Sequence, residues 1–282
     1  MDSKDFLLLT ALHRDARRSY QSLGRAVGLS APAVRDRLTK LRESGILTGY
    51  GLWVDPAVFD RQEVLVFFGR ERSRDEVLKL LREDEVAWIG WKLDGGLTIG
   101  VWTKDTEKSV SHLERVLGEK SAGHAATEIR SLPPLSNLDR AIADALADSP
   151  RIPFGSLVEK TGLSPKTVRR HLSALLESET MEIIPLLGAI SGSGDLVYQL
   201  AVVGEAPMSA IRNVLRDAIL LHQTYSPPMK YLLCRSSDIG EVTSMTREIG
   251  RLAGVEKVTL SLNRELLFSP RLVHTLLKQR AS

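Results

Sequence analysis

Two stretches of the chain carry hydroxyl and basic side chains at spacings that could contact DNA. The candidate contact residues of the first stretch are Ser30, Ala31, Ala33, Arg35, Asp36, Arg37, Lys40 and Arg42. Those of the second stretch are Ser164, Lys166, Thr167, Arg169, Arg170 and His171. Arginine can donate two parallel hydrogen bonds to a guanine edge, whereas lysine and serine can fix phosphate groups. These residue types indicate recognition of double-stranded DNA.

A tight turn and a serine cap precede the first stretch. Gly28 suits the left-handed residue that ends one helix, and Ser30 is a favourable N-cap for the next helix. Val34, Leu38 and Leu41 recur at helical spacing, which predicts one buried face with the basic residues mostly elsewhere. In a helix-turn-helix the second helix of the pair enters the major groove. We therefore expect a recognition helix here.

The surrounding pattern predicts a winged helix-turn-helix in each half of the chain. In the first half we expect helices over 6–12, 20–26 and 30–44, followed by a short hairpin over 46–54 as the wing. In the second half we expect helices over 138–146 and 154–160, a third helix opening at Ser164-Pro165, and a wing over 181–187.

The two halves repeat at a constant offset of 134 residues. Gly28 corresponds to Gly162, and the same offset pairs Arg17 with Arg151. A Pro-Pro pair at 133–134, flanked by polar residues, indicates the linker between the copies. Repeats of this kind imply that one structural plan is used twice.

The second part of each copy changes to short apolar runs with a βαββαβ order. In the first copy we expect strands over 63–69, 86–93, 97–102 and 125–129 and helices over 74–82 and 106–117. In the second copy we expect strands over 196–202, 219–225, 230–234 and 256–260 and helices over 208–218 and 237–252, then a tail helix opening at Pro270. Each unit has the order of a ferredoxin-like fold.

These patterns predict an α+β protein in which two winged helix-turn-helix domains alternate with two ferredoxin-like βαββαβ domains. The expected boundaries are 1–60 and 134–190 for the helix-turn-helix domains and 61–133 and 191–282 for the βαββαβ domains, the last with a C-terminal helical tail. The tandem could act as an internal dimer that recognises two half-sites about one helical turn apart. It could also pair with a second chain to form an assembly with four helix-turn-helix domains.

Composition narrows the remaining classes. The net charge is +3, so a DNA surface must come from where the charges lie rather than from their sum. Cys234 is the single cysteine, which excludes an intrachain disulfide and a zinc site built on several cysteines. No run reaches the roughly 18 apolar residues of a membrane helix, and no secretory signal is evident. We expect a cytoplasmic protein with no membrane association, no metal, no cofactor and no catalytic residues.

The run that includes Asp5, Gly28, Arg37, Gly45 and Tyr50 resembles the leucine-responsive regulator/AsnC (Lrp/AsnC) family of transcription regulators. The resemblance covers nearly the whole chain, twice. It implies a βαββαβ domain, called a RAM domain in this family, that pairs strands between subunits and often binds amino acids.

The same resemblance implies partners for the chain. They are double-stranded DNA, a small-molecule effector such as an amino acid near Gly90 and Asp94, and further copies of the chain joined through the βαββαβ domains. It leaves two alternatives open. One is a tetrapyrrole enzyme, since siroheme decarboxylases are similar to this family and use two homologous halves; His222 beside Tyr225 is then the nearest candidate. The other is an interaction scaffold that does not bind DNA.

We expect the basic residues of the recognition helix to have different roles in DNA binding. Phosphate contacts dominate affinity, so binding should weaken steeply with salt. Loss of the Lys40 charge should weaken binding to all sequences alike, whereas changes at Arg35 or Arg37 should also relax specificity, each by about 1–3 kcal/mol if the contact with guanine is bidentate.

Overall fold

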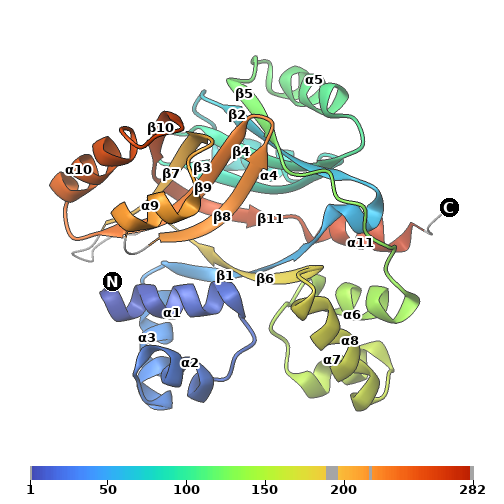
Figure 1. Ribbon diagram of the computed structural model, residues 1–282. Helices are drawn as coiled ribbons and strands as arrows, with labels where there is room; N and C mark the ends of the chain where they lie inside the picture. Colours follow the sequence, from blue (N-terminus) through green and yellow to red (C-terminus); the bar gives the residue numbers. More distant parts are fainter. Residues whose placement is uncertain (1, 189–195, 216–217, 280–282) are drawn as a thin grey trace.

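Two helical units lie side by side on one side of the molecule (Figure 1). The computed structural model, which describes residues 2–188, 196–215 and 218–279, builds both units on the same plan. The first unit contains α1 (Ser3–Arg14), α2 (Tyr20–Val27) and α3 (Ala31–Glu43). The second contains α6 (Asn137–Ala147), α7 (Phe154–Thr161) and α8 (Pro165–Glu177). The two predicted helix-turn-helix units are confirmed.

The strand that follows each unit does not fold back into the hairpin that the sequence suggested. Instead β1 (Leu47–Val54) pairs antiparallel with β6 (Met181–Leu187), so the two copies share one two-stranded sheet. Neither Gly49 nor Gly51 has the positive φ that tight hairpin turns favour. A Cβ atom on Gly51 would lie 2.8 Å from the ring of Phe268, so this glycine permits close packing rather than a turn.

Two equivalent arginines tie each helical unit to the other. Arg17 donates hydrogen bonds to the carbonyl oxygens of Pro150 and Ile152, at 2.7 and 2.9 Å. In the opposite direction, Arg151 donates to the Tyr50 hydroxyl at 2.8 Å and lies over its ring. The repeat paired these arginines but gave them no role. Their contacts across the junction now explain why both copies carry one.

The helical units are joined to two βαββαβ domains, as predicted. The first domain comprises β2 (Gln62–Phe68), α4 (Arg74–Leu80), β3 (Val86–Lys92), β4 (Leu97–Thr103), α5 (Thr106–Leu117) and β5 (Gly123–Ala126), after a 3-10 turn at Pro56–Phe59. The second comprises β7 (Leu196–Gly204), α9 (Met208–Val214), β8 (Ala218–Tyr225), β9 (Pro228–Ser236), α10 (Ile239–Ile249) and β10 (Val255–Ser261). Their strand orders, β3-β4-β2-β5 and β8-β9-β7-β10, correspond to each other.

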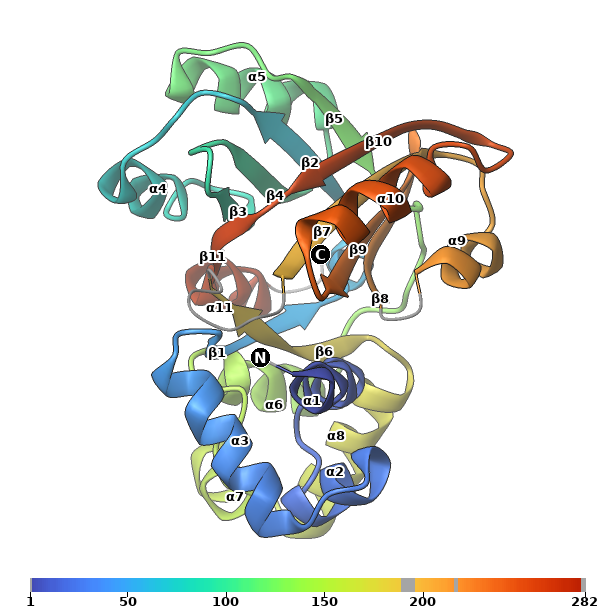
Figure 2. The same ribbon diagram turned by 90° about the vertical axis from the view of Figure 1, so that its left-hand side faces the viewer.

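The two sheets face each other across a small apolar interface. Helices α4 and α5 cover the outer face of the first sheet, and α9 and α10 cover the outer face of the second. The facing surfaces meet through Ala125, Met229 and Tyr231, all buried. Figure 2 shows β1 and β6 between this sheet pair and the helical units. Among the described helices, none has the length and apolarity that a bilayer crossing requires.

The end of the chain returns to the first half of the molecule. Strand β11 (Asn263–Phe268), which the sequence did not predict, pairs antiparallel with β3 and becomes the edge of the first sheet. The tail helix α11 (Pro270–Lys278) was predicted, and it packs on α6. The domain boundaries at 60 and 133 stay a prediction, and the boundary at 190 lies outside the described residues.

Apolar and polar contacts both hold α11 against α6. Leu276 is 2% exposed. Arg140 donates to the carbonyl oxygens of Leu277 and Gln279, at 2.8 and 2.9 Å, which satisfies the end of the helix. His274 contacts Asp144 at 2.6 Å. The tail is therefore part of the core that supports the second helical unit.

Replacing Leu276 with alanine tests this role. Because the side chain is buried against α6, we expect a loss of about 2–5 kcal/mol in the free energy of unfolding, measured by urea denaturation. Lys278→Ala on the same helix is the matched control, because Lys278 is exposed. Equal unfolding midpoints for the two variants would contradict a structural role for α11.

Candidate nucleic-acid interface

Helix α3 begins and is oriented as the sequence indicates. Gly28 ends α2 in the left-handed region, with φ 69°. The Ser30 side chain accepts a hydrogen bond from the Ala33 amide at 3.3 Å and so caps α3. Val34 and Leu38 are fully buried, which fixes the face of the helix that points into the unit. The opposite face is then free to meet a partner.

That outer face carries most of the predicted contact residues of the first copy. The exposed ones are Ser30, Arg35, Asp36, Lys40 and Arg42, while Ala31 and Ala33 are half-buried. The Arg35 side chain is 64% exposed and forms an ion pair with the neighbouring Asp36 at 3.5 Å. An exposed pair of this kind contributes little energy. Arg35 can therefore leave Asp36 for a base edge or a phosphate.

Arg37 lies differently, because it is bound to α1. Its guanidinium contacts Asp2 at 2.7 Å and Asp5 at 2.8 Å, and the side chain is only 31% exposed. The hydrogen bonds that Arg37 donates to Asp2 and Asp5 raise the pKa of Arg37. Burial would raise the pKa of Asp2, but the hydrogen bond from Arg37 brings it below its usual value. Arg37 joins α3 to α1, so its predicted contact with a base competes with two carboxylates.

The second recognition helix, α8, repeats the local geometry. The Ser164 side chain accepts from the Thr167 amide at 3.1 Å, and Gly162 ends α7 with φ 66°. His171 contacts Asp139 at 2.7 Å. These two residues occupy the positions of Arg37 and Asp5 in the repeat, so each copy uses the same pair of positions to join its first and third helices.

The outer faces of the two recognition helices are not equivalent. On α8, Ser164, Lys166, Arg169 and Arg170 are exposed, whereas Thr167 is half-buried. Arg169 lies over the ring of Phe154 at 5.3 Å. The last turn of α3 carries Lys40 and Arg42, whereas the last turn of α8 has no basic residue. The two helices therefore expose their cations at different places, near the start of α8 but as far as the last turn of α3.

The predicted effector residues lie on one hairpin but in different surroundings. Gly90 is buried in β3, between β4 and β11. A Cβ atom there would lie 3.7 Å from the Asn263 amide nitrogen. Asp94 is exposed, and its carboxylate accepts a hydrogen bond from the Gly96 amide at 3.0 Å within the β3–β4 turn. Strand β11 thus covers the sheet edge beside Gly90.

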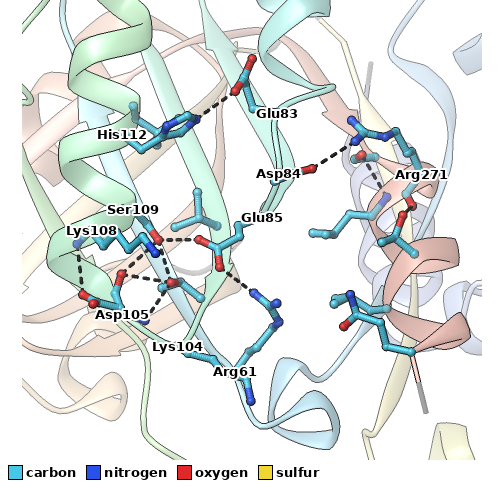
Figure 3. A pocket seen from close by; sticks show the side chains of 18 of the residues that line it. Arg61, Glu83, Asp84, Glu85, Lys104, Asp105, Lys108, Ser109, His112 and Arg271 are labelled. Carbon is cyan, nitrogen blue, oxygen red and sulfur yellow. Dashed lines mark hydrogen bonds and ion pairs between the residues drawn. The ribbon is translucent and has the colours of Figure 1, made fainter. Parts of the chain in front are cut away.

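A charged groove of about 620 Å³ lies between α5, α11 and the start of β3 (Figure 3). Its opposite charges contact each other. The contacts are Arg61 with Glu85 at 2.7 Å, Arg271 with Asp84 at 3.1 Å, and His112 with Glu83 at 2.9 Å. A charged ligand would have to displace these pairs. Within the described residues, no group of three or more His, Cys, Asp or Glu side chains is arranged to hold a metal.

The fold and the two capped, outward-facing helices define a protein of the helix-turn-helix class. An AsnC-type helix-turn-helix domain matches residues 1–42, and a winged helix-turn-helix DNA-binding domain matches residues 135–179. An HTH-type transcriptional regulator of Pyrococcus horikoshii is 30% identical over 158 residues, which cover 52% of this chain and 97% of that protein. This chain belongs to the Lrp/AsnC family of helix-turn-helix transcriptional regulators.

Other relatives match shorter parts. The regulator LrpA of Pyrococcus abyssi is 28% identical over 123 residues, 42% of this chain and 87% of that protein. The chain spans 60% of the length of a regulator of Methanocaldococcus jannaschii, at 33% identity, and 38% of another from Pyrococcus horikoshii, at 39% identity. Among solved structures, the siroheme decarboxylase NirDL aligns over 97% of both chains with 14% identity and a TM-score of 0.49. Escherichia coli AsnC covers 49% of this chain with 20% identity and a TM-score of 0.30.

The contrast between Arg35 and Arg37 gives a direct test of this interface. We expect Arg35→Ala to leave the free energy of unfolding within about 0.5 kcal/mol but to reduce discrimination between DNA sequences by about 1–3 kcal/mol. Arg37→Ala should instead lower stability by about 1 kcal/mol, because Asp2 and Asp5 lose their partner. Urea denaturation and competition binding with two DNA sequences measure both effects. A loss of discrimination only in Arg37→Ala would reverse the two assignments.

Proposed function

We propose that this chain is a cytoplasmic, sequence-specific transcription regulator that binds two half-sites of double-stranded DNA with its two helix-turn-helix units. The observation that carries this proposal is the sheet shared by β1 and β6. Because that sheet and the Arg17 and Arg151 contacts join the units, α3 and α8 are presented to DNA as one body. A dimer of single-copy chains would supply two such helices from two subunits.

The differences between the helices support an operator without exact two-fold symmetry. Arg35 of α3 corresponds to another arginine, Arg169, in α8. However, Asp36 corresponds to Arg170, and Lys40 corresponds to Ala174. Side chains that differ in charge at equivalent positions favour different bases and different numbers of phosphates.

Two expected partners stay predictions within this proposal. An amino acid at Gly90 and Asp94 would have to bind beside the edge that β11 covers. Assembly of two chains through the βαββαβ domains would have to use surfaces that remain outside the internal sheet pair. One chain already provides two recognition helices, so the proposed DNA complex does not depend on either partner.

Catalysis is not part of the proposal. A tetrapyrrole such as siroheme carries several carboxylates, which require unpaired cations. Here Arg130 contacts Asp55 at 2.6 Å and Arg61 contacts Glu85, while His222, the candidate residue, faces Glu63. The surroundings of His222 are therefore acidic, which disfavours a polyanionic substrate.

Selection of bound genomic fragments by the purified protein at two salt concentrations tests the proposal. We expect a bipartite motif whose halves differ and whose enrichment falls steeply with salt. Lys40→Ala should lower the affinity for all fragments alike. Salt-sensitive binding without any motif would contradict sequence-specific regulation, and absence of binding would favour the scaffold or the enzyme.

The joint action of the units is tested through Arg17. Binding by linked modules gains from effective concentration. Arg17→Ala loosens the link, so we expect about tenfold weaker binding to a duplex with both half-sites and a change below about twofold on a duplex with one half-site. Arg18→Ala, at the adjacent position, is the matched control, because Arg18 donates a hydrogen bond to Ser22 within its own unit. Equal losses on both duplexes would contradict the role of Arg17.

A further inference from the structure

A group of adjoining cavities occupies the junction of the helical units and the facing sheets. One of about 720 Å³ and one of about 370 Å³ share His13, Glu182, Leu221 and His222. A smaller hollow of about 60 Å³ is also lined by His13 and Leu221, and it lies against the second sheet. The lining comes from α1, β6 and β8. A ligand here would touch both helical units and a βαββαβ domain.

The wider part of this junction cavity contains the carboxylate of Glu182, which lies on β6. Among the described residues, none forms a hydrogen bond or an ion pair with this side chain. Burial and the nearby carboxylates, above all Glu179, raise its pKa to about 6. The charge of His222 acts in the opposite direction but does not offset them. A cation placed beside Glu182 would relieve this repulsion.

The two fully buried carboxylates of the cavity, Glu63 and Asp55, already have partners. The Glu63 carboxylate is 2% exposed and accepts hydrogen bonds from the indole nitrogens of Trp88 and Trp102 at 2.9 and 3.1 Å. Burial alone would raise its pKa, but the charge and hydrogen bond of His222, with the two indoles, bring it below its usual value. Asp55 is bound by Arg130. Unlike these two carboxylates, Glu182 can accept a ligand without breaking an existing contact, and it is half-buried where the neighbouring Glu179 is exposed.

The small hollow offers a second observation that points to a ligand. Gln199, which is 6% exposed, and Asn263 both line it. Among the described residues, neither of their buried amide oxygens has a hydrogen-bond partner. Leaving a buried acceptor unsatisfied costs about 1–3 kcal/mol, so native proteins rarely do so. Around these oxygens the lining is apolar, with Ile219 and Leu233.

We propose that the junction cavity binds a small primary amine with an apolar body and a hydrogen-bond donor at its far end. The ammonium group lies beside Glu182, the apolar body contacts Leu221, and the donor reaches the amide oxygens of Gln199 and Asn263. Binding of the amine does not depend on the proposed function, but its effect on DNA affinity does. Because α1 and β6 line the cavity, an occupant changes the relative position of the two recognition helices and so the affinity for DNA.

Glu182→Gln provides a folded variant for the test. The pKa of Glu182 is near 4.5 in the unfolded chain and about 6 in the folded protein. Such a group stabilises the fold below pH 4.5, and this stabilisation is lost as the pH rises through about 6. The amide has no such loss. We expect Glu182→Gln to unfold at a higher urea concentration than the parent at pH 8 and at the same concentration at pH 4. An equal midpoint at pH 8 would show that Glu182 is not under repulsion.

Tyramine is the probe, because its ammonium group and its phenolic donor lie at opposite ends of an aromatic body. Its binding to the full chain without DNA is measured by calorimetric titration. Three analogues are measured in the same way: tyrosol is neutral, 4-hydroxyphenylacetate is anionic, and phenethylamine lacks the phenolic donor. We expect tyramine to bind at least about tenfold more tightly than the neutral and anionic analogues. Phenethylamine should bind a few-fold more weakly than tyramine.

Variants locate the binding within the cavity. Glu182→Gln should weaken tyramine binding about tenfold, and Gln199→Leu should bring it to the level of phenethylamine. Glu107→Gln, an exposed carboxylate on α5, should have no effect. No binding of tyramine, equal binding of 4-hydroxyphenylacetate, or binding unchanged by Glu182→Gln would overturn the proposal. DNA affinity measured without tyramine tests the proposed function separately, so the two failures can be told apart.

Discussion

The pairing of β1 with β6 is the contact on which the rest of the arrangement depends. Strands from opposite copies satisfy each other's backbone groups, so neither helical unit has a complete sheet of its own. Arg17 and Arg151 extend the junction with bonds in both directions. Once the two strands are joined, the positions of α3 and α8 are set by the chain itself, and the sheets that follow must face each other.

Local patterns predicted most elements, because caps and apolar spacing act within a few residues. Ser30, Gly28 and the spacing of Val34 and Leu38 define α3 as found. The sequence could not distinguish a local hairpin from a strand that pairs with the other copy, since both use the same alternation. For the same reason β11 was missed: its partner, β3, lies about 170 residues earlier in the chain. Strand pairing at this distance leaves no local signal.

Residue roles were harder to predict than elements. Arg35 and Arg37 are two positions apart on a basic helix, yet one is exposed and the other contacts Asp2 and Asp5. The junction cavity could not be predicted at all, because Glu182 and Gln199 come to line adjoining cavities only after both sheets and β6 are in place. The same strand that aligns the recognition helices thus lines the cavity, which gives a bound molecule a physical route to the DNA surface.

Hydroxyl-radical footprinting at a measured ratio of chain to DNA tests the central claim most directly, because it records which backbone positions one molecule covers. With an operator obtained by selection, we expect two protected patches on one face of the helix when one chain is bound per duplex. A single patch at that ratio, with the second appearing only when a second chain binds, would be the opposite result. It would contradict the claim that the shared sheet holds both recognition helices of one chain in position to bind DNA together.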